Sequence, residues 1–245
     1  MKLKAFHRLT YGLYLIASEF QGKKTGYIAN TVFQVTSLPE QLAISCHKNN
    51  FSTKIILDSG IFSVSVLKKE VNLKIIGDFG FMSSTDINKF SGIKSITSKT
   101  GAPIVVDSSI AWFDCRVTKS IDLGSHFLII GEVLDSDEIS GEEPLTYQYY
   151  RDKYKMFSPK NSPTYIEKSL IDSEIQTVVV DERGDEPDVT YFDGEKYICA
   201  ICGFTYNPEE GDPSVGIPPG TPFEALPEDY KCPICNAGKE YFKKV

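Results

Sequence analysis

Four cysteines near the C-terminal end constrain this chain more than any other feature. Cys199 and Cys202 form one C-x-x-C pair, and Cys232 and Cys235 form a second pair after a spacer of about thirty residues. Two intervening residues let a tight turn direct both sulfurs of a pair at one point, so two facing turns supply four ligands in tetrahedral geometry. The spacing predicts a metal site for iron or zinc. From spacing alone, a structural zinc ribbon and two disulfides remain alternatives.

The surroundings of the cysteines favour the metal interpretation. Gly203 directly follows Cys202 and Asn236 directly follows Cys235, where a left-handed turn would point backbone N–H groups at the sulfurs. A module of about fifty residues is too small to be stabilised by its core alone, so a bound ion would supply much of the folding free energy. We expect an aromatic cluster to shield the site from water, made of Tyr197, Tyr206, Phe223, Tyr230 and Phe242.

Residues 195–245 closely resemble rubredoxin. The resemblance rests on the segments 196–199, 207–213, 219–221 and 232–235. It implies one iron ion held by Cys199, Cys202, Cys232 and Cys235. Two positions depart from the usual pattern, because Tyr230 stands where rubredoxins commonly have tryptophan and Asn236 stands in place of glycine. Both departures are physically acceptable, since tyrosine keeps an aromatic ring and asparagine tolerates the left-handed conformation.

The charge distribution indicates how the chain is divided. The net charge is −7, and residues 167–194 hold nine acidic side chains against Lys168 and Arg183. This stretch also contains Gly184, Pro187 and Gly194, as expected of a solvated tether. We therefore predict a first domain at 1–166, an acidic linker at 167–194 and a rubredoxin domain at 195–245. The acidic surface either steers a basic protein partner or is simply solvated.

Composition excludes several classes of function. No basic stripe with interleaved aromatic residues is present, so a nucleic-acid partner is not expected. No signal region or bilayer-spanning apolar stretch is present either, so we expect a cytoplasmic protein without a membrane partner. In that compartment Cys46 and Cys115 are expected to be buried free thiols. No Ser/His/Asp or Cys/His set stands out in the sequence, so a hydrolase is not expected.

The first 166 residues are rich in strand signals. Runs of β-branched and aromatic residues bounded by turn residues occur at 9–18, 41–45, 61–67, 104–106, 111–117 and 127–134. Many short strands predict a barrel or a sandwich. Two helices are expected, one at 53–58 with Ser52 as N-cap and one at 71–78 starting near Glu70 or Asn72. No Gly-x-Gly-x-x-Gly motif follows a strand, so a Rossmann site is not expected.

Several segments of this domain resemble the flavin reductase family. They follow the family's order and span most of residues 1–155: 26–31, 34–39, 45–53, 79–80, 86–90, 125–133 and 149–151. The resemblance implies a mainly β protein, an FMN-binding split β-barrel with a few helices, which forms a homodimer. It places FMN near the subunit interface.

The same resemblance implies a set of flavin contacts. Asn30, Thr31 and Val32 would line the isoalloxazine ring. A helix N-terminus at Ser52 and Thr53 suits the phosphate, because exposed N–H groups and hydroxyls there attract anions, although these two residues could instead only cap the helix. The other implied contacts, some flanking the ring and ribityl chain and two lysines supplying charge, are Gln34, Ser45, Cys46, His47, Lys48, Asn50 and Lys89.

His126 begins a predicted strand, and the resemblance places it near the flavin as a candidate catalytic residue. The alternative is a structural histidine.

Together the two modules indicate an oxidoreductase. FMN accepts a hydride and releases electrons singly, and one iron ion carries one electron at a time. The fusion resembles the high-molecular-weight rubredoxins of anaerobes, which implies oxidation of NAD(P)H and electron transfer to a flavodiiron protein that reduces nitric oxide or oxygen. The sequence does not distinguish NADH from NADPH. One alternative is a free-standing flavin or ferric reductase with an accessory rubredoxin tail, and another is a non-catalytic flavin-binding protein with a structural zinc ribbon.

Overall fold

The computed structural model describes residues 3–154, 158–159, 161–165, 195–199, 204–235 and 237–244. The predicted acidic linker at 167–194 lies outside the described residues, as do Cys202, Gly203 and Asn236.

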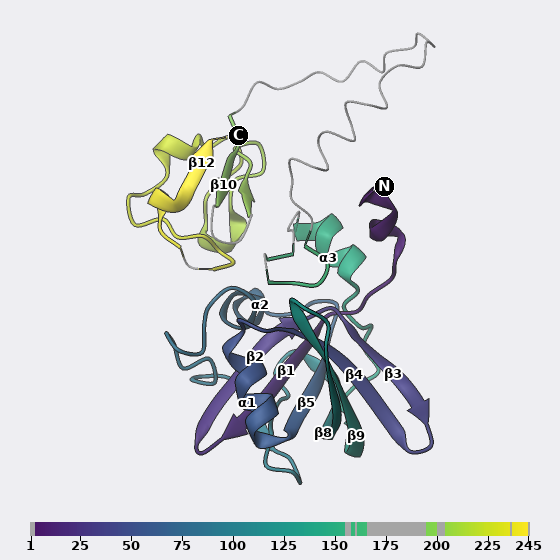
Figure 1. Cartoon of the computed structure of the whole chain (residues 1–245). Coiled ribbons are helices and arrows are strands. Elements are labelled where there is room, and N and C mark those ends of the chain that lie inside the picture. The colour runs from purple at the N-terminus through teal and green to yellow at the C-terminus, as the bar shows by residue number, and fades with distance from the viewer. Residues whose placement is uncertain are drawn as a thin grey trace, which may run out of the picture.

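A seven-stranded antiparallel sheet forms the body of the N-terminal part (Figure 1). Its order is β2-β1-β5-β8-β9-β4-β3, so β2 and β3 are its edges. The strands are β1 (Tyr14–Phe20), β2 (Lys23–Ala29), β3 (Val32–Ser37), β4 (Glu40–His47), β5 (Ile61–Leu67), β8 (Ser109–Asp122) and β9 (His126–Glu138). A 3-10 helix, η1 (Leu3–Arg8), precedes the sheet, and β6 (Ser95–Thr97) pairs with β7 (Pro103–Val105) beside it. The expected mainly β fold is confirmed.

Alternating side chains of the sheet fill two cores. In β1, Leu15 and Ala17 belong to one apolar cluster, whereas Ile16 between them belongs to the other, as the two-residue period of a strand requires. The core that contains Ile16 also holds Cys46 and Cys115, both fully buried, and neither thiol forms a disulfide. The expected burial of these two cysteines is confirmed.

Three α-helices accompany the sheet. The first, α1 (Phe51–Ser59), is capped by Asn50, whose side chain accepts a 3.0 Å hydrogen bond from the Ser52 backbone N–H. The prediction of Ser52 as N-cap is therefore wrong, because the helix starts one residue before it. The second, α2 (Leu73–Gly80), is capped by Asn72, which is one of the two predicted starts. Among the described residues, no helix is long and apolar enough to cross a membrane.

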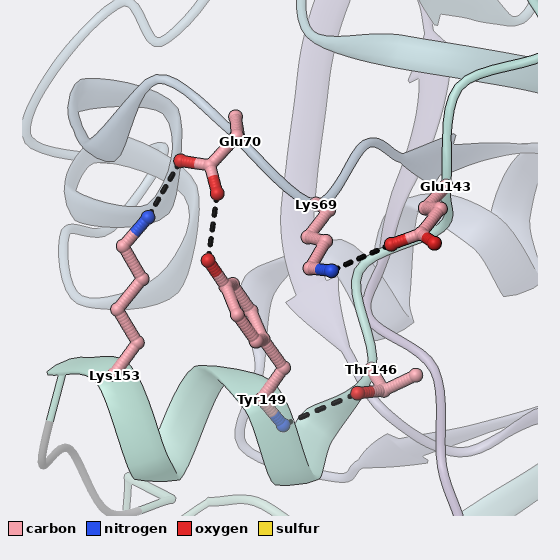
Figure 2. Close-up of polar contacts among 6 residues, drawn as sticks. All are labelled: Lys69, Glu70, Glu143, Thr146, Tyr149 and Lys153. Atoms are coloured by element: carbon pink, nitrogen blue, oxygen red, sulfur yellow. Dashed lines mark hydrogen bonds and ion pairs between the residues drawn. The ribbon is translucent and has the colours of Figure 1, made fainter.

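The third helix, α3 (Tyr147–Tyr154), is tied to the segment that leads into α2 (Figure 2). The carboxylate of Glu70 accepts hydrogen bonds from the Tyr149 hydroxyl at 2.6 Å and from Lys153 Nζ at 2.5 Å. Beside it, Lys69 pairs with Glu143 at 2.6 Å. Each of these exposed pairs contributes little stability by itself. Together they attach the segment before α2 to α3 through Glu70 and to Glu143 through Lys69.

The C-terminal module is a small three-stranded sheet with an aromatic core. Its strands are β10 (Tyr197–Cys199), β11 (Thr205–Tyr206) and β12 (Phe242–Lys244), joined by loops that contain η2 (Pro213–Val215), η3 (Phe223–Ala225) and η4 (Lys239–Tyr241). Tyr197 stacks on Phe223 with ring centroids 4.1 Å apart, and Tyr206, Tyr230 and Phe242 surround the same ring. The five residues of the predicted aromatic cluster therefore form one group, in which the other four rings all contact Phe223.

Candidate functional site

Three of the four predicted metal ligands converge in the C-terminal module. The sulfurs of Cys199, Cys232 and Cys235 are buried and lie within 4.8 Å of one another. Cys199 Sγ and Cys235 Sγ are 3.6 Å apart. Tetrahedral metal–sulfur bonds of about 2.3 Å place two sulfurs about 3.8 Å apart, whereas a disulfide needs about 2.05 Å. The donor set therefore fits a tetrathiolate metal ion, with Cys202 as the predicted fourth ligand outside the described residues.

The two cysteine loops are closed by the same backbone hydrogen bond. The N–H of Cys199 donates to the carbonyl of Phe204 at 2.7 Å, and the N–H of Cys232 donates to the carbonyl of Ala237 at 2.8 Å. Each bond joins the first cysteine of a pair to the residue five positions later. The described ends of the two loops are therefore closed in the same way, as a four-ligand cage requires.

A pocket of about 360 Å³ lies in the N-terminal part, within the size range of small-molecule sites. The ends of β2 and β4, the start of α1 and the end of α2 line it. Pro159, Asn161, Ser162 and Pro163 complete the wall.

Six of the predicted flavin contacts line this pocket. They are Asn30, Thr31, Ser45, His47, Asn50 and Lys89. They come from three segments that are far apart in sequence, at 30–31, 45–50 and 89, so the fold gathers them at one place. Asn30 Nδ2 also donates a 2.6 Å hydrogen bond to Thr164 Oγ1, which ties the strand end to the segment after α3.

The other predicted contacts lie outside the lining of this pocket. Cys46 is buried in the core against the Tyr27 hydroxyl, and burial raises its pKa to about 12. Ser52 hydrogen-bonds Thr25 at 2.7 Å, and Thr53 donates to the carbonyl of His47 at 2.8 Å, so both hydroxyls are used within the protein.

Three further predicted contacts are on other surfaces. Val32 lines a separate cleft beside η1 and α3. The Gln34 amide is exposed on β3 and donates to the carbonyl of Thr36 at 3.1 Å. Lys48 pairs with Asp122 at 2.6 Å.

Lys89 is the buried cation of the pocket. Its side chain is only 4% exposed, and Nζ donates to the carbonyl of Gly26 at 2.9 Å. Burial lowers the pKa of Lys89 to about 8, and the charges of Asp78 and Asp86 oppose this shift. An ammonium group that is held by backbone carbonyls beside a pocket is suited to an anionic group of a ligand.

His126 lies directly behind the pocket wall. Its ring meets that of His47 edge to face at 4.8 Å, and Nε2 lies 3.3 Å from the carbonyl oxygen of Asn161. Since His47 and Asn161 both line the pocket, His126 contacts the pocket through them. Burial lowers the pKa of His126, and the neighbouring His47 lowers it further.

Sequence reasoning missed part of the pocket. Phe81, Met82, Ser83 and Ser84 line it after the end of α2, as do the prolines 159 and 163. The flavin reductase resemblance includes residues 79–80 and 86–90 on either side of the first of these segments. The prolines are in a loop whose composition carries no signal for a binding role.

Comparison with known proteins agrees with this architecture. Residues 6–158 match the flavin reductase like domain family, and residues 196–242 match rubredoxin. A high molecular weight rubredoxin of Moorella thermoacetica is 41% identical over 245 residues, which is 100% of both chains. A ferric-chelate reductase (NAD(P)H) of Archaeoglobus fulgidus is 41% identical over 167 residues, which are 68% of this chain and 99% of that protein.

A solved structure supports the fold of the N-terminal part. A nitrilotriacetate monooxygenase component B homologue from Mycobacterium thermoresistibile superimposes with a TM-score of 0.55 at 27% identity, over 69% of this chain and 92% of that one.

The chain therefore belongs to the flavin reductase-like family and carries a rubredoxin domain at its C-terminal end. It has the two-domain organisation of high-molecular-weight rubredoxins. These matches make it an NAD(P)H-dependent oxidoreductase whose flavin reductase-like domain implies a flavin and whose rubredoxin domain implies iron, and they favour this class over a non-catalytic zinc protein.

Proposed function

We propose that this protein is a cytoplasmic electron-transfer enzyme that oxidises NADH on bound FMN and passes the electrons through the rubredoxin iron to a flavodiiron protein. The acceptor would then reduce nitric oxide or oxygen, which makes nitric oxide detoxification the physiological role. The observation that carries the proposal is the presence of a 360 Å³ pocket with six predicted flavin contacts and a buried thiolate cage in one chain.

The residues of the chain have separate tasks in this proposal. Asn30, Thr31 and Ser45 would position the flavin ring, and Lys89 would hold its anionic end. His126 would orient His47 and the loop at Asn161 rather than touch the ring. The bound flavin supplies the conversion of a two-electron hydride donor into two one-electron deliveries, and the cage supplies a one-electron carrier.

The first experiment is the visible spectrum of the purified protein without oxygen, before and after NADH is added. The proposal predicts flavin and iron–thiolate bands that both bleach. Bands that remain unchanged with NADH, while dithionite bleaches them, would reject NADH as the donor. A spectrum with flavin alone would place zinc or no metal in the cage and would reject the relay.

The acceptor is tested separately. A purified flavodiiron protein should consume nitric oxide or oxygen with NADH only when this chain is present, and a Cys232→Ser variant should abolish the coupling. Turnover that persists with the variant would mean that electrons leave from the flavin instead.

Ferric reduction is the second candidate function, because the N-terminal part is 41% identical to a ferric-chelate reductase over 99% of that protein. In that case ferric chelates would be reduced by NAD(P)H at the same rate in wild type and in Cys232→Ser. Retention of FMN during gel filtration separates the candidates further, since a relay keeps its flavin and a reductase of free flavin exchanges it.

A homodimer is also part of the proposal. The edge strand β3 carries the exposed apolar side chains of Phe33 and Val35, and Leu38 directly after it is 89% exposed. An exposed apolar edge strand is costly in water and is suited to burial against a second copy. Phe33→Glu with Val35→Lys should convert the protein from dimer to monomer in sedimentation experiments, and an unchanged mass would place the interface elsewhere.

A further inference from the structure

The rubredoxin domain is seated on helix α2 through a glycine. A Cβ atom added to Gly77 would overlap the carbonyl oxygen of Ile234 and would lie 3.7 Å from the Cα of Cys235. Gly77 is buried in the middle of α2, and Ile234 stands between the second pair of cysteines. The helix backbone is therefore in direct contact with the backbone of a metal-ligand loop. Figure 1 shows the C-terminal module near α2.

The contact continues as an apolar interface. One cluster of buried side chains joins Val71, Ile75 and Ile76 of the first domain to Ile234 and Cys235 of the second. In a C-x-x-C turn the sulfurs face the metal and the residues between them face outward, yet Ile234 is only 4% exposed. The face of α2 covers this outward-facing residue.

The same helix also borders the flavin pocket. Phe79 and Gly80 at the end of α2, and Phe81 directly after it, line the pocket. Gly77 is two to four residues from these positions, which is about one helical turn or a rise of about 5.4 Å. The pocket lining and the Cys235 loop thus meet the same short helix about one turn apart.

We infer that α2 is the docking platform on which the rubredoxin domain of the same chain receives electrons from the flavin, and that Gly77 is the positioning residue that permits the close approach. This inference rests on the proposed function. NAD(P)H gives one hydride, which is two electrons and a proton, to the flavin. Two successive one-electron transfers then reduce ferric iron to ferrous iron, each followed by transfer of the electron to the protein acceptor, while the flavin protons return to water.

The structure supplies a variant that separates docking from folding. Gly77→Ala introduces one methyl group that meets the Ile234 carbonyl, but alanine is the better helix former, so α2 itself should not be weakened. Gly141→Ala is the matched control, because a Cβ at Gly141 meets nothing within 4 Å. In amide hydrogen exchange of the full-length protein with flavin and iron bound, Gly77→Ala should lose protection in residues 73–80 and 229–235, whereas the control should not.

The second readout is anaerobic stopped-flow spectroscopy, in which flavin and iron bands are followed separately. Gly77→Ala should leave the rate of flavin reduction unchanged and slow iron reduction about tenfold, since overpacking an interface lowers the docked population by at least that factor. Unchanged iron reduction, or unchanged exchange protection, would overturn the inference. If NADH does not reduce the wild-type flavin, the proposed function fails, but photoreduction of the flavin still allows iron reduction to be timed in both variants.

Discussion

The hydroxyl of Tyr230 donates a 2.8 Å hydrogen bond to the carboxylate of Asp212, and both groups are buried inside the rubredoxin domain. Asp212 also accepts from the backbone N–H of Ser214 at 3.1 Å and so caps η2. The Tyr230 side chain therefore links the loop before the second cysteine pair to the loop that follows β11. The resemblance to rubredoxin marks Tyr230 as a departure from tryptophan, and this bond gives the tyrosine a specific partner.

Tyr230→Phe should destabilise the rubredoxin domain by about 1–3 kcal/mol, because a carboxylate that is 4% exposed loses a donor and stays buried. Release of iron during urea unfolding, followed by the iron–thiolate absorbance, should shift to lower urea concentration. Tyr241→Phe is the control, since Tyr241 is half exposed and the same hydroxyl is removed at the surface. Equal midpoints for the two variants would contradict this role for Tyr230.

The metal site was predictable because its signal is local. Each C-x-x-C pair spans only four residues of sequence, and four aromatic residues of the predicted cluster contact the fifth, Phe223. The N-terminal strands were predictable where most of their side chains are buried, as in β5. β3 is largely exposed, and α3 has the polar sequence YQYYRDKY, so neither carries a strong apolar period.

The flavin pocket was less predictable because tertiary contacts build it. Ser45 and Cys46 are neighbours in sequence, but they alternate across β4, so Ser45 lines the pocket and Cys46 is in the core. Likewise α1 begins at Phe51, two residues before the predicted start at Thr53, and the Ser52 hydroxyl is hydrogen-bonded to Thr25 inside the protein. Family order pointed to segments that the fold brings to this pocket, and the pleat of the strand decided which of their residues line it.

Cys232→Ser should remove iron from the protein and leave the flavin domain intact. A bound tetrathiolate ion contributes about 10 kcal/mol or more to the folding of a small module, far more than a core of this size supplies. Metal analysis should show loss of iron, and near-ultraviolet circular dichroism should show loss of aromatic packing. Cys115→Ala removes a thiol outside the cage and should keep full iron content. Iron retained by Cys232→Ser would contradict the assigned ligand set.

Cys46 should resist alkylation in the folded protein although its neighbours Ser45 and His47 line the pocket. Burial raises its pKa to about 12, so the reactive thiolate is about 10⁻⁴ of the population at pH 8. Burial also raises the pKa of Cys115. Mass spectrometry after iodoacetamide treatment should show both thiols labelled only after unfolding. A cysteine introduced at the exposed Ser120 by Ser120→Cys should be labelled at once, and similar rates at Cys46 would refute its burial.

Lys89 should make FMN binding depend on pH. Its pKa of about 8 means that the ammonium form dominates at pH 7, and a bound phosphate would stabilise that form and raise the pKa. FMN affinity should therefore be constant below pH 8 and fall by up to about tenfold per pH unit above it. The free energy of unfolding of the apoprotein should change in the opposite direction and rise between pH 8 and 10.5, because the unfolded lysine, with its pKa of 10.5, binds more protons there.

Lys89→Met should weaken FMN about 10- to 100-fold at pH 7, the factor expected for a charge-assisted hydrogen bond, and should remove the decline above pH 8. Fluorescence titration of the apoprotein with FMN across pH measures both effects. Lys48→Met is the matched control, because Lys48 pairs with Asp122 and does not line the pocket. If Lys48→Met loses affinity and Lys89→Met does not, the phosphate binds at Lys48, beside Asp122, and not at Lys89.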